Sequence, residues 1–239
     1  MTDMHCHVIW GVDDGASSRE ESESLLKTMY EDGVSVICLT PHFMPSHFGM
    51  NQDRVLQRFS ELKEYVKEKI PGLRLALGNE LRYDPISMRA LESGMCRTLN
   101  GTRYVLVDFS AEESGDVIER ALFSLMNAGY WPVLAHAERY GRLKPMEDRI
   151  RRLRAEQVVL QVDAESFSGE WGFGAKKRSR MLLKRELIDL VASDTHDLKE
   201  RCPKLSEIYR LVEKEKGSQF ADRVLRVNPL RILCGKEVN

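Results

Sequence analysis

Short apolar runs alternate with longer amphipathic segments along almost the whole chain, and this alternation constrains the fold more than any other feature. Seven runs are typical of buried strands, namely the opening MHCHVI, 34–40, 74–81, 103–109, 132–137, 158–164 and 188–194. Helical periodicity is found at about 17–32, 52–69, 85–93, 115–128, 145–156 and 174–186, and in a tail from 203 to 227. Near-continuously apolar strands that alternate with helices predict an α/β fold with a parallel sheet. Seven units suit a closed barrel, and an open doubly wound sheet is the alternative.

Polar side chains recur where these runs end. His5 and His7 stand two apart in the first run, so an extended strand would point both to one face. Beyond this pair, such residues are Asp14, His42, Glu80, Asp108, His136, Asp194 and His196. A single Asp at a strand end is usually a turn former, but in a barrel the carboxyl ends of all strands surround one mouth. Imidazoles and carboxylates gathered there need cations, which predicts a site for more than one metal ion.

The donor types indicate the metal and the reaction. Imidazole and carboxylate without thiolate suit Mn²⁺, Fe²⁺ or Zn²⁺ better than Ca²⁺ or an iron–sulfur cluster. Arg139 and Arg201 follow strand-end histidines, in loops at the same mouth, and each guanidinium matches two oxygens of a phosphate. Metals and arginines together favour phosphate-ester hydrolysis, in which a hydroxide attacks phosphorus while cations absorb the developing charge.

Composition narrows the remaining classes of protein. The formal net charge of −1 argues against a nucleic-acid partner. Five scattered cysteines without a CxxC pair favour reduced thiols in a cytoplasm. We find no apolar segment long enough for a signal peptide or a bilayer span. We therefore expect a cytoplasmic protein with one domain over residues 1–239 and no membrane insertion, and we leave its oligomeric state open.

Seven motifs occur in the order typical of one known family. They are DMHCHVIWGVDDGA, TPHF, GNELRYDP, YVLVDF, PVLAHAERY, QVDAESFSG and ASDTHDLKER, between residues 3 and 201. The set resembles the PHP superfamily (polymerase and histidinol phosphatase), and within it the bacterial metal-dependent protein-tyrosine phosphatases of capsule and exopolysaccharide operons. The resemblance implies a distorted, TIM-like (β/α)7 barrel with two or three metal ions, usually Mn²⁺. It also implies hydrolysis of phosphotyrosine on the tail of a tyrosine autokinase that controls polysaccharide assembly.

The same resemblance assigns roles to residues by motif. The metal ligands would be His5, His7, His42, Glu80, Asp108, His136, Asp194 and His196. Asp14 would be a ligand or a proton donor, and Arg139 and Arg201 would bind the phosphate.

The chain departs from the family pattern at two of these motifs. Asp108 stands where family members commonly have Glu, so either its strand shifts inward or one metal ion is held more weakly. Phe43 stands where a second His often follows the TPH motif, and His47 either substitutes for that His or lines the loop.

Two other functions are alternatives. Another phosphomonoesterase on the same fold, such as a histidinol-phosphate phosphatase, would use the same kind of ligand set. A catalytically silent metal-binding module, like the PHP domains that are structural parts of polymerases, would need neither a complete ligand set nor two arginines. The complete set therefore favours an enzyme.

Overall fold

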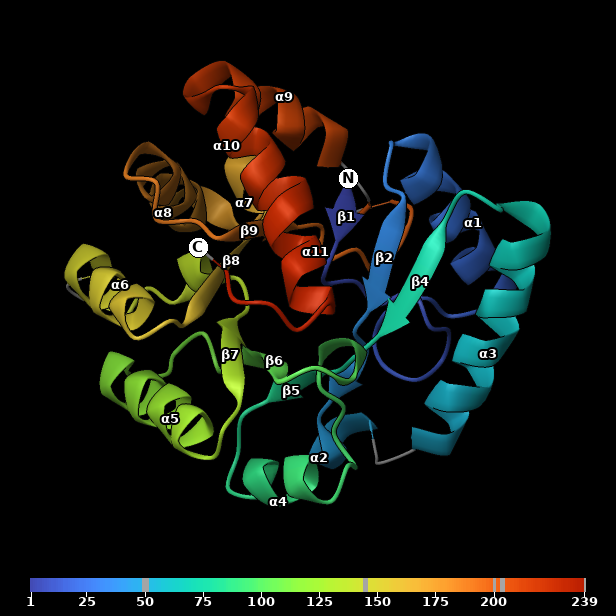
Figure 1. The fold of residues 1–239 in the computed structure, drawn as a ribbon, viewed down its shortest axis with the longest axis horizontal. Helices are drawn as coiled ribbons and strands as arrows, with labels where there is room; N and C mark the ends of the chain where they lie inside the picture. Colours follow the sequence, from blue (N-terminus) through green and yellow to red (C-terminus); the bar gives the residue numbers. More distant parts are fainter. Residues whose placement is uncertain (49–51, 144–145, 200, 203–204, 239) are drawn as a thin grey trace.

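The computed structural model describes residues 1–48, 52–143, 146–199, 201–202 and 205–238 (Figure 1). Its strands are β1 (Thr2–Asp3), β2 (Val36–Leu39), β3 (His42–Phe43), β4 (Arg74–Leu77), β5 (Glu80–Arg82), β6 (Tyr104–Asp108), β7 (Trp131–Leu134), β8 (Val159–Asp163) and β9 (Leu190–Ala192). They form two sheets, ordered β1-β2-β4 and β3-β5-β6-β7-β8-β9, in which neighbouring strands are parallel. The prediction of a parallel sheet is confirmed.

One predicted strand bends and contributes to both sheets. The prediction of a single strand over 74–81 is wrong, because β4 pairs with β2 whereas β5 pairs with β6. The second run bends in the same way, and its continuation β3 pairs with β5 so that His42 lies opposite Glu80. The two bends place His42 and Glu80 next to each other at the mouth, which straight strands would not do.

The first and last segments of the barrel join the two sheets into a closed ring. Cys6 and Thr195 form a parallel β-bridge. Around it the N–H of His7 donates to the carbonyl of Thr195 over 2.8 Å, and the N–H of Asp194 donates to the carbonyl of His5 over 2.9 Å. The strands thus curl into a barrel-like arrangement, which favours the barrel alternative over the open doubly wound sheet. Strand β1 itself ends at Asp3, so the histidine pair lies in the bridge segment and not in the predicted strand.

Helices surround this ring, except the last one, which lies across it (Figure 1). They are α1 (Arg19–Glu31), α2 (Pro45–Phe48), α3 (Gln52–Lys69), α4 (Ser87–Glu92), α5 (Gly115–Asn127), α6 (Met146–Ala155), α7 (Ala164–Ser168), α8 (Gly172–Lys184), α9 (Leu205–Lys216), α10 (Ser218–Asp222) and α11 (Asn228–Leu233). Two 3₁₀ turns, η1 (Leu99–Gly101) and η2 (Ala137–Arg139), and a π-helical turn, η3 (Arg223–Val227), complete the structure. The helical tail extends past its predicted end at 227. Within the described part of the chain, no helix has both the length and the apolar character needed to cross a membrane.

Strand side chains alternate between an outer and an inner apolar cluster. In β6, Val105 and Val107 pack outward against the helices, whereas Tyr104 and Leu106 face the barrel interior. Helix α11 closes the interior at the amino ends of the strands with Ile232 and Leu233. At the opposite end the inward-facing rows finish in polar residues, namely Asp108 after Leu106, Asp163 after Gln161 and Asp194 after Ala192. The alternation therefore builds an apolar floor under a polar mouth.

Candidate metal centre

Four buried side chains meet at the centre of the mouth. The Nε2 atoms of His5 and His7 lie 3.1 Å apart, and Glu80 Oε2 is 3.3 Å from each of them. Asp194 Oδ1 completes the group at 3.2 Å from the His5 nitrogen and 3.4 Å from the His7 nitrogen. Ligands that bind one ion at about 2.0–2.1 Å are separated from one another by about this spacing.

Hydrogen bonds on the far side of each imidazole fix which nitrogen faces the centre. The Nδ1 atom of His5 lies 3.0 Å from Gln161 Oε1, and Nδ1 of His7 lies 2.7 Å from Asp13 Oδ2. Both oxygens only accept, so each Nδ1 carries a proton, and in its neutral form each ring points an Nε2 lone pair inward. Two lone pairs and two carboxylates facing one another require a cation, either protons or a metal ion. The donor set fits a divalent metal.

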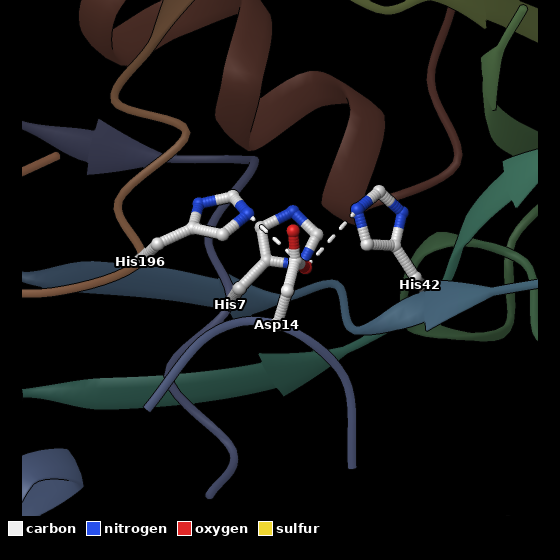
Figure 2. Close-up of side chains that lie close together, drawn as sticks. All are labelled: His7, Asp14, His42 and His196. Atoms are coloured by element: carbon white, nitrogen blue, oxygen red, sulfur yellow. Dashed lines mark ion pairs between the residues drawn. The ribbon is translucent and has the colours of Figure 1, made fainter. Parts of the chain in front are cut away.

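Two further groups adjoin this centre. Glu80 Oε1 lies 3.0 Å from His136 Nε2, which is 3.5 Å from Asp108 Oδ1. On the other side, Asp14 Oδ1 lies 3.4 Å from His42 Nε2 and 3.5 Å from His196 Nε2, with His7 beside them (Figure 2). The structure therefore brings together all eight residues predicted as ligands, and Asp14, in three adjoining groups.

The charges of the centre support one another. Burial alone would raise the pKa of Glu80 and of Asp194, but the surrounding histidines, and for Asp194 also Arg139 and Arg201, hold both pKa values well below the usual range. Burial opposes a charge on His5, yet Glu80 and Asp194 raise its pKa to about 9. The cluster thus keeps its carboxylates ionised and stabilises positive charge between them.

Backbone geometry at two strand ends departs from the usual regions. His136 and Asp194 have φ values of +33° and +53°, in the left-handed region that residues with a side chain rarely adopt. Such positions are retained where the surrounding structure requires them, and they cluster at functional sites. Here the turns aim both side chains into the mouth.

The turn after His7 contains a residue whose role the sequence analysis missed. Asp13 accepts a hydrogen bond from His7 Nδ1, from the N–H of His42 over 2.9 Å and from the N–H of Gly15 over 3.0 Å. Gly15 packs so closely that a Cβ there would lie 1.9 Å from the carbonyl oxygen of His7. Asp13 thus orients two of the predicted ligands, as carboxylates behind metal-binding histidines do.

The shorter side chain at Asp108 is shared among several partners. Its Oδ1 accepts from the hydroxyl of Tyr140 over 3.0 Å, and its Oδ2 pairs with Arg82 over 2.7 Å. Strands β5 and β6 keep regular pairing, with Arg82 opposite Asp108. Both alternatives for this position, an inward shift of the strand and a weaker hold on one ion, stay predictions.

His47 lies in α2, away from the three groups. Its side chain is exposed and contacts Ser46 and Phe48. The loop-lining alternative for His47 therefore fits the structure, and substitution for the missing second His does not.

A cavity of about 370 Å³ opens over the centre and is lined by both predicted phosphate-binding arginines. The NH2 atoms of Arg139 and Arg201 lie 2.7 Å and 2.6 Å from Asp194 Oδ2. The Nε atoms of both are buried without a hydrogen-bond partner, so each arginine has donor capacity left. The guanidiniums lie over Trp171, at 3.4 Å and 5.1 Å from the ring centroid.

Comparison with known proteins places this arrangement in a family. A family model described as capsular polysaccharide synthesis, CpsB/CapC, matches residues 1–234. The chain belongs to the CpsB/CapC family. Tyrosine-protein phosphatase CpsB of Streptococcus pneumoniae is 35% identical over 238 residues, which cover 98% of each chain. Tyrosine-protein phosphatase YwqE of Bacillus subtilis is 30% identical over 221 residues, covering 92% of this chain and 87% of YwqE.

Solved structures agree with the CpsB/CapC assignment. A chain from the crystal structures of YwqE and CpsB, reported as unique metal-dependent tyrosine phosphatases, aligns with a TM-score of 0.91 and 26% identity, covering 100% of this chain and 96% of that one. The histidinol phosphate phosphatase of Lactococcus lactis aligns with a TM-score of 0.58 and 16% identity, over 90% of this chain and 93% of its own, which shows a shared fold. The PHP-type fold and the family predicted from the motifs are confirmed.

The cysteines of this CpsB/CapC chain do not form a phosphatase loop. Position six after Cys6 is Val12 rather than Arg, and burial raises the pKa of the Cys6 thiol well above its usual value. We expect Cys6→Ser to keep kcat/KM on p-nitrophenyl phosphate within a few-fold of native, whereas His136→Ala should nearly abolish turnover. A folded, metal-loaded Cys6→Ser protein without activity would instead point to a covalent cysteine mechanism.

A buried carboxyl beside the centre gives the CpsB/CapC chain a pH-dependent stability. Glu165 in α7 is 2% exposed, and its Oε1 has no hydrogen-bond partner. Burial, followed by repulsion from Glu170, Asp163 and Asp194, raises the pKa of Glu165 from 4.5 to about 8, although Arg201 opposes the shift. The folded state therefore binds a proton that the unfolded chain releases, and stability falls as pH rises between these two values.

Glu165→Gln is expected to remove this part of the pH dependence, because the amide is neutral throughout. The melting temperature of the variant should gain on that of the native protein as pH rises from about 5 to about 9. The same difference in melting temperature between variant and native protein at both pH values would show that burial does not raise the pKa of Glu165 in the folded state.

Proposed function

We propose that this chain is a metal-dependent protein-tyrosine phosphatase that acts on a bacterial tyrosine autokinase controlling capsule or exopolysaccharide synthesis. The observation that supports it most strongly is one cavity that combines three adjoining donor groups with two arginines. Membership of a family whose named relatives are tyrosine-protein phosphatases supports the reaction class.

The proposed ligands would hold two or three ions, for which we infer Mn²⁺, with Fe²⁺ or Zn²⁺ as alternatives. These ligands are His5, His7, His42, Glu80, Asp108, His136, Asp194 and His196. The bound ions would lower the pKa of a water and neutralise charge on the phosphate. Glu80 has one oxygen toward each of two donor groups, and its charge would help to hold ions at both.

Asp14, Arg139 and Arg201 act around the phosphate in this proposal. Asp14 is half exposed at the rim, and despite partial burial, His196 and His42 keep its pKa below the usual range. An ionised Asp14 suits the ligand role better than that of a proton donor. Arg139 and Arg201 would donate to the non-bridging oxygens, leaving the phenol of the substrate toward the open end of the cavity.

We further infer that the chain is a single domain over residues 1–239 that works in the cytoplasm. A tyrosine-phosphorylated kinase tail is the proposed partner, since its exposed tyrosines would reach a cavity that lies at the surface. A formal net charge of −1 gives no support for nucleic acid as a partner.

The test compares a phosphotyrosine peptide with histidinol phosphate, using protein stripped by chelator and reconstituted with Mn²⁺, Fe²⁺ or Zn²⁺. We expect no turnover after stripping, recovery with Mn²⁺, and a higher kcat/KM for the peptide. Preference for histidinol phosphate would favour the other phosphomonoesterase. Inactivity on both substrates and on p-nitrophenyl phosphate, with every metal, would indicate a silent metal-binding module.

A further inference from the structure

Asp163 ends strand β8 without the usual role of a strand-end aspartate. It precedes α7, yet its side chain makes no capping hydrogen bond to that helix. The carboxylate is fully buried and faces the mouth, because the inward row of β8 runs from Val159 through Gln161 to Asp163. There it forms an ion pair with the NH2 atom of Arg139. This buried carboxylate therefore pairs with an arginine instead of capping the helix that follows it, which indicates that the ion pair is its main role.

Gln161 fixes the orientation of this carboxylate and links it to the metal centre. Its amide nitrogen donates to Asp163 Oδ1 over 2.6 Å. Because a carboxylate accepts only, the amide oxygen of Gln161 must face the other way, where it accepts from His5 Nδ1 over 3.0 Å and from the N–H of His136 over 3.2 Å. One connected network therefore joins two proposed ligands to the carboxylate under Arg139.

Arg139 has two carboxylate partners, Asp163 and Asp194, and these two differ in their other contacts. Asp194 also faces His5, His7 and Arg201, and it belongs to the proposed ligand set. An ion held by Asp194 would draw on the same negative charge that attracts Arg139. Asp163 belongs to none of the three donor groups, so its charge stays available to the guanidinium.

We propose that Asp163 is a positioning residue, which holds the Arg139 guanidinium in the orientation that binds phosphate. Asp163 affects phosphate binding only through Arg139. The proposal rests on the proposed function. Asp163 pairs with the NH2 atom of Arg139, and Trp171 covers one face of the guanidinium, whose Cζ lies 3.4 Å from the ring centroid. The buried Nε has no hydrogen-bond partner in the protein, and in this proposal a phosphate oxygen becomes its partner. An arginine fixed at one corner and one face loses little further freedom when phosphate binds.

The first test is Asp163→Asn in the Mn²⁺-loaded enzyme, with inorganic phosphate as the probe. We expect the phosphate dissociation constant, measured by calorimetry, to rise about ten- to hundredfold while bound metal stays at the native level. Asp189→Asn is the matched control, because Asp189 is also buried and pairs with an arginine, Arg154 over 2.7 Å, but lies before β9 at the closed end of the barrel. The control should lower the melting temperature and leave phosphate binding unchanged.

The second test asks whether Asp163 acts through Arg139. In an Arg139→Ala background, adding Asp163→Asn should cost less than a further twofold in phosphate affinity, since there is no guanidinium left to position. Equal losses in both backgrounds, unchanged phosphate binding in the single variant, or loss of bound metal would each overturn the proposal. Turnover of a phosphotyrosine peptide by the native enzyme, measured on the same preparation, tests the proposed function separately. A native enzyme that binds no phosphate would overturn both the proposed function and the role of Asp163.

Discussion

Glu80→Gln is expected to abolish turnover and to lower the content of bound metal. Its two oxygens face different histidine groups, 3.3 Å from the nitrogens of His5 and His7 and 3.0 Å from that of His136. An amide keeps the shape but removes the charge, and its N–H₂ has no lone pair to offer a metal ion on one of the two sides. We expect kcat/KM on a phosphotyrosine peptide to fall by at least about a thousandfold.

Elemental analysis of the reconstituted protein measures the second part of this result. Glu119→Gln is a suitable control, because Glu119 in the outer helix α5 pairs with Arg149 and Arg152 of α6 and lies outside the mouth. It loses the same charge and should keep both metal and activity. Full metal content with native activity in Glu80→Gln would show that Glu80 does not bridge the centre.

Arg139→Ala and Arg201→Ala are each expected to lower kcat/KM by about 10²–10³-fold while leaving bound metal intact. Each guanidinium keeps unpartnered donor capacity over the cavity, and the charge on the phosphate oxygens that it would contact changes during transfer. Arg139→Lys should recover only part of the loss, since lysine keeps the charge but not the planar fork.

A structural role would give a different pattern for these arginines. Both arginines contact Asp194, so in a structural role their removal would destabilise the fold by leaving a buried carboxylate without ion pairs. Melting temperature, bound metal and kcat/KM measured on the same preparations separate the two. A lower melting temperature with activity retained would assign both arginines to stability.

Much of the site was predictable because its polar residues lie at the carboxyl ends of the apolar runs. The carboxyl ends of parallel strands share one mouth, so His136 after one apolar run and Asp194 after another had to meet once a barrel formed. The positive φ values at these two positions were not predictable, because tertiary contacts and not local propensity impose them.

The residues behind the site were harder to predict. Asp13 stands in a turn, where its type is common for local reasons, and only the fold shows that it reaches His7 and His42. Gln161 did carry a signal, since an amide inside the apolar run 158–164 and two residues before Asp163 shares its face. The bends after β2 and β4 carried a signal too, since Pro41 follows the first strand and Gly78 the second, and both residue types interrupt regular strands.

The bridge between Cys6 and Thr195 has a consequence for how the protein is made. Residues far apart in the sequence supply the central cluster, with His5 and His7 on one side of the bridge and Asp194 on the other. During synthesis the early residues are made long before Asp194, so the central cluster cannot be complete until that residue has been translated. Contacts so distant in sequence also close slowly. Truncation before β9 would therefore leave His5 and His7 without Asp194, one of the two acidic partners that they share.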